Sequence, residues 1–207
     1  MAFIQELEDL DSDDLLAEFD RPTLPDSGEL GFVLFQELAA KLRDRDPERA
    51  IGELLRRYGC ADSDRAVGIV FGLTMDDEDA AHLPLVRAAV ERPEPDVVAE
   101  AIDGRRHLGD TDSSSRIEAL LDSPHVRVRS AVLRYLAGTK HPDAVAILRA
   151  SLDDPEGNVR ANAVDELVEL AGLEAELWVL PLANDPCELV RNIVRDALAA
   201  EREYPRD

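Results

Sequence analysis

LRASLDDP (148–155) shares its order of apolar, charged and proline positions with VRAAVERP (86–93). IEALLDSP (117–124) and VLPLANDP (179–186) fit the same order without a gap. The prolines that end these four octets are evenly spaced, at 93, 124, 155 and 186. A fixed period of about 31 residues predicts a stacked structural repeat, because one duplicated motif would not recur four times in phase.

An apolar stripe follows each proline. Its members recur at i, i+4 and i+8, which marks one face of a helix. Arg105 breaks the third column in the first of these units. The columns are Val97, Val128, Val159 and Val190, then Ala101, Val132, Ala163 and Val194, then Leu136, Leu167 and Leu198. Each unit is therefore predicted to hold a helix A after the proline and a helix B that ends before the next one, each of about 12 residues.

Short breakers separate the two helices of a unit: HLGDTDSS (107–114), AGTKHPDA (137–144) and ELAGLEAE (169–176). We expect glycine to end helix A, and Asp, Ser or Pro to start helix B. Two such helices cannot bury their apolar faces alone, but stacked pairs can. The sequence thus predicts an all-α solenoid of antiparallel helix pairs.

The repeat is clearest over residues 93–200 and fades toward the N-terminus, where Gly68 and Gly72 weaken a predicted helix. We predict that the solenoid spans 30–200. Residues 1–29 are expected to form an acidic capping helix or two and a proline-rich connector, and 201–207 a tail.

Two stretches resemble HEAT repeats of the short type first associated with phycobilisome lyases: VRVRSAVLRYLAGTKHPDAVAILRASLDDP (126–155) and NVRANAVDELVEL (158–170). The shared features are a V-R-x-x-[AV]-x-x-x-L helix, a glycine-containing turn and an L-x-x-[AL]-L-x-[DN]-x-P ending. The resemblance implies a right-handed α-solenoid. It does not define one function, because such repeats serve scaffolds, adaptors, lyases, hydroxylases and DNA glycosylases alike.

The resemblance implies a structural role for the arginines of the V-R pairs, Arg129, Arg160 and Arg191. In-phase charges along a solenoid form ladders with neighbouring carboxylates, and we expect Asp122 to pair with Arg129 and Asp153 with Arg160. A ligand-binding role for these arginines is the alternative.

The charge is strongly negative, with 45 acidic and 23 basic residues and a formal net charge of −22. Phosphate backbones and anionic lipids require cationic surfaces, so neither nucleic acid nor a membrane is expected as partner. The same field raises the rate of encounter with a basic protein. Alternatively, the acidity serves solubility in a salt-rich cytoplasm.

The residue pattern contains no constellation typical of an enzyme. Cys60 and Cys187 lack a metal-ligand spacing, and the four histidines lie in turns or at helix starts. We therefore predict no catalytic residue, no metal site and no cofactor. No run of 18 apolar residues and no secretory leader is visible, which favours a cytoplasmic protein.

The predicted binding surface is the row of B helices, which line the concave face in HEAT-like solenoids. Its solvent-facing column is small: Ala88, Ala119, Ala150 and Pro181. The charged candidates flank this column: Arg87, Glu118 and Arg149 on one side, and Glu91, Asp122 and Asp153 on the other. Trp178 falls in phase with Ile147 and is expected in the core.

This surface favours a non-catalytic protein-binding solenoid, acting as a scaffold, an adaptor or an inhibitor of a basic partner, with an immunity-type protein as one version. The alternative is an enzyme of the HEAT-repeat lyase type that uses the concave groove for a small ligand. The oligomeric state stays open at this stage.

Overall fold

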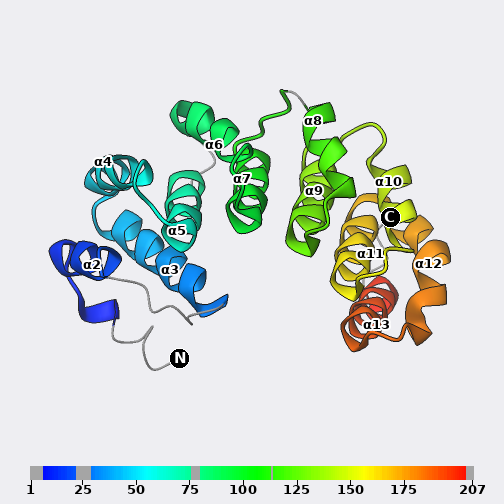
Figure 1. The fold of residues 1–207 in the computed structure, drawn as a ribbon. Coiled ribbons are helices and arrows are strands. Elements are labelled where there is room, and N and C mark those ends of the chain that lie inside the picture. Colours follow the sequence, from blue (N-terminus) through cyan, green and yellow to red (C-terminus); the bar gives the residue numbers. More distant parts are fainter. Residues whose placement is uncertain (1–6, 22–28, 76–79, 113, 204–207) are drawn as a thin grey trace. The chain divides into compact units, whose positions relative to one another are not determined.

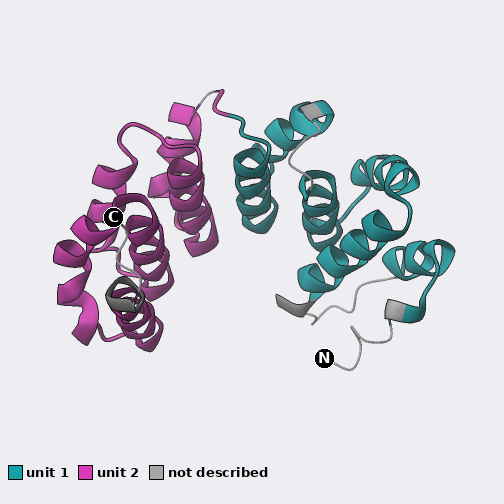
Figure 2. Ribbon diagram, turned by 180° about the vertical axis from the view of Figure 1, so that it is seen from behind, with its two compact units in different colours: residues 1–110 teal, residues 111–207 magenta. Residues whose placement is uncertain are grey.

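The structure is a computed structural model that describes residues 7–21, 29–75, 80–112 and 114–203. Those residues form helices joined by turns, and they contain no strand. The chain divides into two compact units, residues 1–110 and 111–207 (Figure 2). Within each unit, helices that follow one another in sequence pack against one another, which confirms the predicted all-α class of stacked helices.

The first unit is built around three helices that follow one another as helix A of each pair (Figure 1). They are α3 (Glu29–Arg45), α5 (Ser63–Thr74) and α7 (Pro95–His107), and α5 packs between the other two. The remaining helices are η1 (Leu7–Asp9), α2 (Ser12–Phe19), α4 (Pro47–Tyr58), η2 (Ala80–His82) and α6 (Leu83–Ala89). Of these, α2 packs on α3, α4 contacts both α3 and α5, and α6 packs on α7.

The second unit repeats this arrangement (Figure 1). Its A helices are α9 (Val126–Gly138), α11 (Gly157–Ala171) and α13 (Glu188–Glu203), with α11 packed between the other two. Its B helices are α8 (Ser114–Glu118) with the 3-10 helix η3 (Ala119–Asp122), α10 (Ala144–Ser151), and α12 (Leu173–Val179) with the 3-10 helix η4 (Leu180–Asn184). Because α10 contacts both α9 and α11, this B helix ties two neighbouring A helices together.

The B helices of the second unit are shorter than predicted, whereas α4 in the first unit has the predicted 12 residues. The helices α8, α10 and α12 have 5, 8 and 7 residues, shorter than the three turns or more that the periodicity indicates. Two of them continue as 3-10 helices, and Pro181 in η4 explains one case because proline lacks the N–H that the α-helical bond requires. Residues 22–28 of the predicted proline-rich connector (20–29) and the end of the predicted tail (204–207) lie outside the described residues, and α13 runs to Glu203.

The predicted apolar columns form the core. All eight residues of the first two columns, which are valines and alanines, are buried. The helix B positions Val86, Val90, Leu148 and Leu152 are buried as well. Each buried valine or leucine side chain among them contributes about 1.5–3 kcal/mol to the stability of the fold. Arg105, which breaks the apolar stripe in the sequence, is also buried: its Nε donates to the Asp110 carboxylate at 2.7 Å.

Two glycines that weaken α5 as an isolated helix allow close packing. A Cβ atom on Gly68 would lie 2.5 Å from the Cβ of Phe35 and 2.6 Å from its carbonyl carbon. A Cβ atom on Gly72 would lie 2.7 Å from the Cβ of Ala39. Since real Cβ atoms do not approach so closely, α5 can lie against α3 only with glycine at these positions.

Three of the A helices are followed by a residue with positive φ, and after α11 this residue is Gly172, with φ 52°. Gly109 has φ 61° after α7, and the N–H of Asp110 donates to the Arg105 carbonyl at 2.9 Å. Lys140 holds the equivalent position of the next repeat with φ 55°, and the N–H of His141 donates to the Leu136 carbonyl at 2.9 Å. The predicted glycine terminator at 138 therefore lies inside α9, and a lysine adopts the terminating conformation instead.

Candidate functional site

A groove of about 530 Å³ lies on the second unit between α10 and the α12–η4 segment. Two alanines of α10, Ala146 and Ala150, lie in this lining and leave room for close approach by another chain. The lining residues are Ala146, Arg149, Ala150, Leu152, Asp153, Trp178, Pro181 and Leu182. This groove therefore contains part of the B-helix surface that the sequence singled out.

Trp178 contributes more to this surface than predicted. It is half-buried and packs against the core, but it also lines the groove. The guanidinium carbon of Arg149 lies 4.5 Å from the centre of its ring, which is the geometry of a cation–π contact. Trp178 thus packs against the core as predicted and in addition forms, with Arg149, part of the groove wall.

Three exposed leucines lie on the α12–η4 segment, which forms one side of the groove. Leu173, Leu177 and Leu180 are 54%, 78% and 52% exposed, and their spacing of four and three residues places them on one helix face. We call them the leucine ridge. Leu177 precedes Pro181 by four residues, so the ridge adjoins the groove wall that Pro181 forms. Exposed apolar patches of this kind mark sites of interaction with other molecules.

Acidic side chains lie in the groove lining and on α12 itself. Glu169 and Glu174 are exposed, and Asp153 is exposed on the α10 side. Glu174 lies within three or four residues of both Leu177 and Trp178, so its carboxylate belongs to the same helix surface. The apolar surface is therefore edged by negative charge.

The six charged candidates divide between the two units. Arg149 and Asp153 line the groove, while Glu118 and Asp122 lie in the same unit on α8 and η3. The carboxylate of Glu118 is 4.0 Å from His141 Nε2, and Asp122 is exposed.

Arg87 and Glu91 belong to the first unit. The Nε of Arg87 donates to the buried Asp110 carboxylate at 2.9 Å, so this arginine is engaged in an internal ion pair. The predicted column of small residues between the charges is exposed as expected at Ala88, Ala119, Ala150 and Pro181.

Two arginines of the V-R pairs bind carboxylates near the end of their own repeat, in the turn just before the next A helix. The Nε and Nη2 atoms of Arg129 donate to Asp154 at 3.0 and 2.9 Å, and those of Arg160 donate to Asp185 at 2.9 and 2.7 Å. The expected pairings of Arg129 with Asp122 and of Arg160 with Asp153 are therefore wrong. We call the two observed pairs the arginine ladder; both arginines reach forward by 25 residues.

The ladder shifts the acidity of its carboxylates. The hydrogen bonds from Arg160 hold the pKa of Asp185 below its ordinary value against the opposing effect of burial. The N–H of Cys187 donates to the same carboxylate at 2.7 Å and acts in the same direction. Asp185 is thus held ionised between its arginine and the start of α13.

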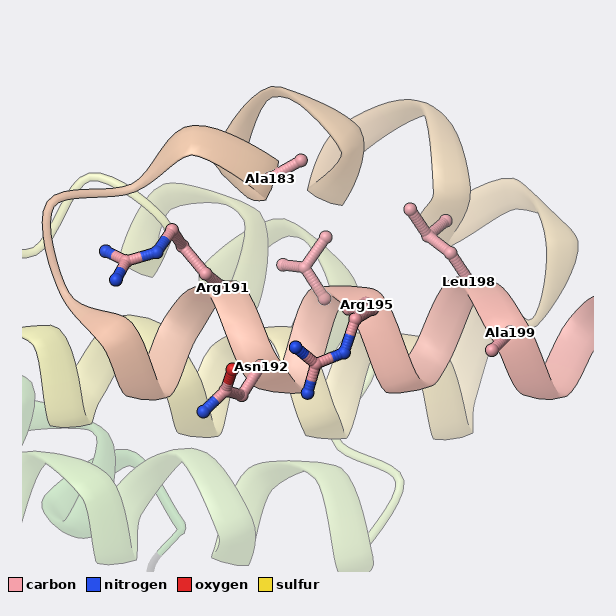
Figure 3. Close-up of a pocket in the computed structure, with 7 residues that line it drawn as sticks. Ala183, Arg191, Asn192, Arg195, Leu198 and Ala199 are labelled. Carbon is pink, nitrogen blue, oxygen red and sulfur yellow. The ribbon is translucent and has the colours of Figure 1, made fainter.

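A second groove, of about 510 Å³, lies along α13 (Figure 3). Ala183 of η4 stands on one side, and the remaining lining residues come from α13: Arg191, Asn192, Val194, Arg195, Leu198 and Ala199. Figure 3 shows Arg191 and Arg195 leaving the helix in different directions. Unlike the first groove, this one is bordered by positive charge.

The described residues hold no group of three or more His, Cys, Asp or Glu side chains placed to bind a metal ion. Cys60 is an exposed free thiol and Cys187 a half-buried one. No helix in the described part of the chain is long and apolar enough to cross a membrane.

The family model for HEAT repeats matches residues 80–165 of the chain. The match confirms the resemblance on that segment, which extends from η2 into α11 and consists of HEAT repeats. HEAT repeats are generally scaffolds for protein interactions. No curated protein matches the chain.

Proposed function

We propose that this chain is a non-catalytic binding protein whose α10–α12 groove and leucine ridge take up an amphipathic, basic segment of another protein. The observation that carries the proposal is the leucine ridge, because Leu177 is 78% exposed on the segment that also supplies Trp178, Pro181 and Leu182 to the groove. An isolated exposed leucine needs no explanation, but three on one helix face are costly to leave in water.

The shape of this surface favours a helix or an extended loop as ligand. Ala146, Ala150 and Pro181 let a partner backbone approach closely, and the leucine ridge offers contacts to the apolar face of an amphipathic helix. The aromatic ring of Trp178, stacked under Arg149, supplies a rigid anchor of the type that contributes strongly to binding.

The charge of this surface favours a basic ligand. Glu174 of α12 and Asp153 of the groove lining carry negative charge at this surface, and the whole chain carries a net charge of −22. Such a field speeds the encounter with a basic partner and disfavours acidic ones. A scaffold, an adaptor and an inhibitor of a basic toxin or nuclease all fit this chemistry; loss of the partner's own activity in the complex distinguishes the inhibitor.

Affinity purification with matched variants tests the proposal. Leu177→Ser removes the most exposed leucine, and Leu55→Ser removes an exposed leucine of α4 in the first unit. We expect the wild type and Leu55→Ser to retain the same basic partner, and Leu177→Ser to weaken its Kd about tenfold or more, as for a central contact residue.

Binding is then measured with the purified partner by Trp178 fluorescence at several salt concentrations. The association rate should fall as salt rises, because the steering charges are screened. A partner of acidic isoelectric point, or equal loss of binding in both leucine variants, would contradict the proposal.

A further inference from the structure

Arg160 shows how an arginine of the arginine ladder is held in this protein. The Nη1 atom of Arg160 donates to two backbone carbonyls of the preceding turn, those of Asp154 at 2.7 Å and Pro155 at 3.0 Å. Its other two donors, Nε and Nη2, then point together at the carboxylate of Asp185. The carbonyl contacts fix the guanidinium. The remaining edge presents two parallel N–H donors that bind both oxygens of one carboxylate, and we call this edge the fork.

Arg191 is held by the same contacts. Its Nη1 donates to the carbonyls of Asp185 at 2.7 Å and Pro186 at 3.0 Å, the same two distances as in Arg160. Among the residues that the structure describes, none accepts a hydrogen bond from Nε or Nη2 of Arg191. The fork is therefore formed and oriented, but its carboxylate is not supplied by the described part of the chain.

The groove along α13 gives this fork an accessible setting. Arg191 lines the groove and is half-exposed, and Val194 and Leu198 contribute apolar surface next to it. Arg195 borders the same groove; its only described partner, Asp196, is exposed like Arg195 itself. A ligand in this groove thus meets a carboxylate fork, a second positive charge and an apolar strip (Figure 3).

We propose that Arg191 is a docking point for an aspartate of a partner protein, presented in a turn like those that carry Asp154 and Asp185. A guanidinium and a carboxylate make paired hydrogen bonds, stronger than bonds between neutral groups, and an arginine that is already immobilised loses little further freedom on binding. The site is independent of the α10–α12 groove and selects the opposite charge.

The occupant is another protein rather than a second copy of this chain. Two copies would bring together two net charges of −22, and this repulsion opposes self-association. A partner with an acidic turn but a smaller total charge meets the local positive charge of Arg191 and Arg195. At physiological salt the long-range repulsion is screened beyond about 8 Å, while the direct contact persists.

A peptide titration tests the site. The probe is the capped peptide ASLDDPEGN, which copies residues 150–158 and contains the ladder aspartate, Asp154. The ¹H–¹⁵N signal of the Arg191 Nε–H group is followed by NMR on the full chain at physiological salt. We expect a saturable shift of this signal, whereas the corresponding signals of Arg129 and Arg160 stay in place because their forks are filled.

Two pairs of controls separate a fork from simple charge attraction. In the peptide, Asp154→Asn should weaken binding about tenfold, since it removes a charged acceptor, and Asp153→Asn should leave it nearly unchanged. In the protein, Arg191→Lys keeps the charge but removes the fork and should lower affinity by about the same factor, while Arg195→Lys should have a smaller effect.

The peptide variants keep the test valid even if Arg191→Lys alters the fold. No shift at millimolar peptide, equal binding by the two peptide variants, or unchanged affinity of Arg191→Lys would overturn the proposal. A shift that follows the concentration of the protein alone would mean that a second copy fills the site, and would overturn the assignment to another protein.

Discussion

The two units share one architecture, but the contacts between helices inside each unit differ. In the first unit, α3 and α5 touch through Gly68 and Gly72. In the second, the A helices are linked by the arginine ladder, which repeats in register with the sequence. The second unit is therefore the one whose repeat is plain in the sequence, because its stabilising contacts themselves recur from one repeat to the next.

The ion pairs of the first unit follow the local geometry instead of the repeat. Arg57 donates to Asp20 through Nε and Nη2, both at 2.7 Å, and so ties α4 to the end of α2. Asp110 accepts from both Arg87 and Arg105. These pairs stabilise individual junctions, and losing one of them would leave the rest intact.

The largest expected effect comes from breaking the ladder. Asp185→Ala leaves the largely buried guanidinium of Arg160 without its carboxylate, and loss of one partner of a buried pair costs about 3–5 kcal/mol. The free energy of unfolding of the second unit should fall by about 3 kcal/mol. The only tryptophan, Trp178, belongs to this unit, so denaturation followed by its fluorescence measures the change. Asp153→Ala, at an exposed carboxylate, is the control and should change stability by about 0.5 kcal/mol or less.

The next effect concerns the glycine contact of the first unit. Gly68→Ala places a methyl group against the backbone of Phe35 and should destabilise that unit by about 2 kcal/mol, as overpacking does. Gly52→Ala is the matched change on α4, where a Cβ meets nothing within 4 Å, and should stabilise by about 0.5–1 kcal/mol. Denaturant unfolding followed by far-ultraviolet circular dichroism compares the two. Equal effects of both alanines would show that close packing at Gly68 does not matter.

The smallest expected effect concerns the turn that follows an A helix, which both units contain. Lys140 adopts φ 55° at the position that Gly109 holds in the preceding repeat. Lys140→Gly removes the strain of a left-handed lysine and should raise the melting temperature, with a gain of about 1 kcal/mol at most because glycine also loses more freedom on folding. Calorimetry of the wild type and the variant measures this gain. Gly138→Ala, inside α9, should stabilise as well, whereas a terminator at Gly138 would make that variant less stable.

The core of the fold was predictable from the sequence because the burial of an in-phase apolar side chain does not depend on one particular partner residue. Val128 and Val159 recur in phase, and both are buried. Arg105 was harder to interpret, since its burial depends on Asp110 and on the turn at Gly109 that brings the two together. The same holds for Gly68, whose close contact with Phe35 joins residues far apart in the sequence.

The candidate site was predictable only in part. The small residues of the B-helix row are exposed as expected, but the predicted ladder partners were wrong because adjacent aspartates, Asp153 and Asp154, point to different sides of one turn. The leucine ridge does have a signal in the sequence: Leu173, Leu177 and Leu180 are out of phase with the core positions Ala175 and Val179. The carboxylate site at Arg191 in the groove along α13 has no signal in the sequence pattern, since it depends on which N–H donors of Arg191 have no acceptor among the described residues.

The forward reach of the ladder makes the repeat a self-contained cassette for protein engineering. Residues 156–186 hold both Arg160 and the Asp185 that it binds, so a tandem copy inserted after Pro186 would bring its own arginine and its own acceptor. The original Arg160 would keep Asp185, and the copied arginine would find the copied aspartate 25 residues further on. The length of the second unit can therefore be changed in steps of one repeat without leaving a buried charge unpaired.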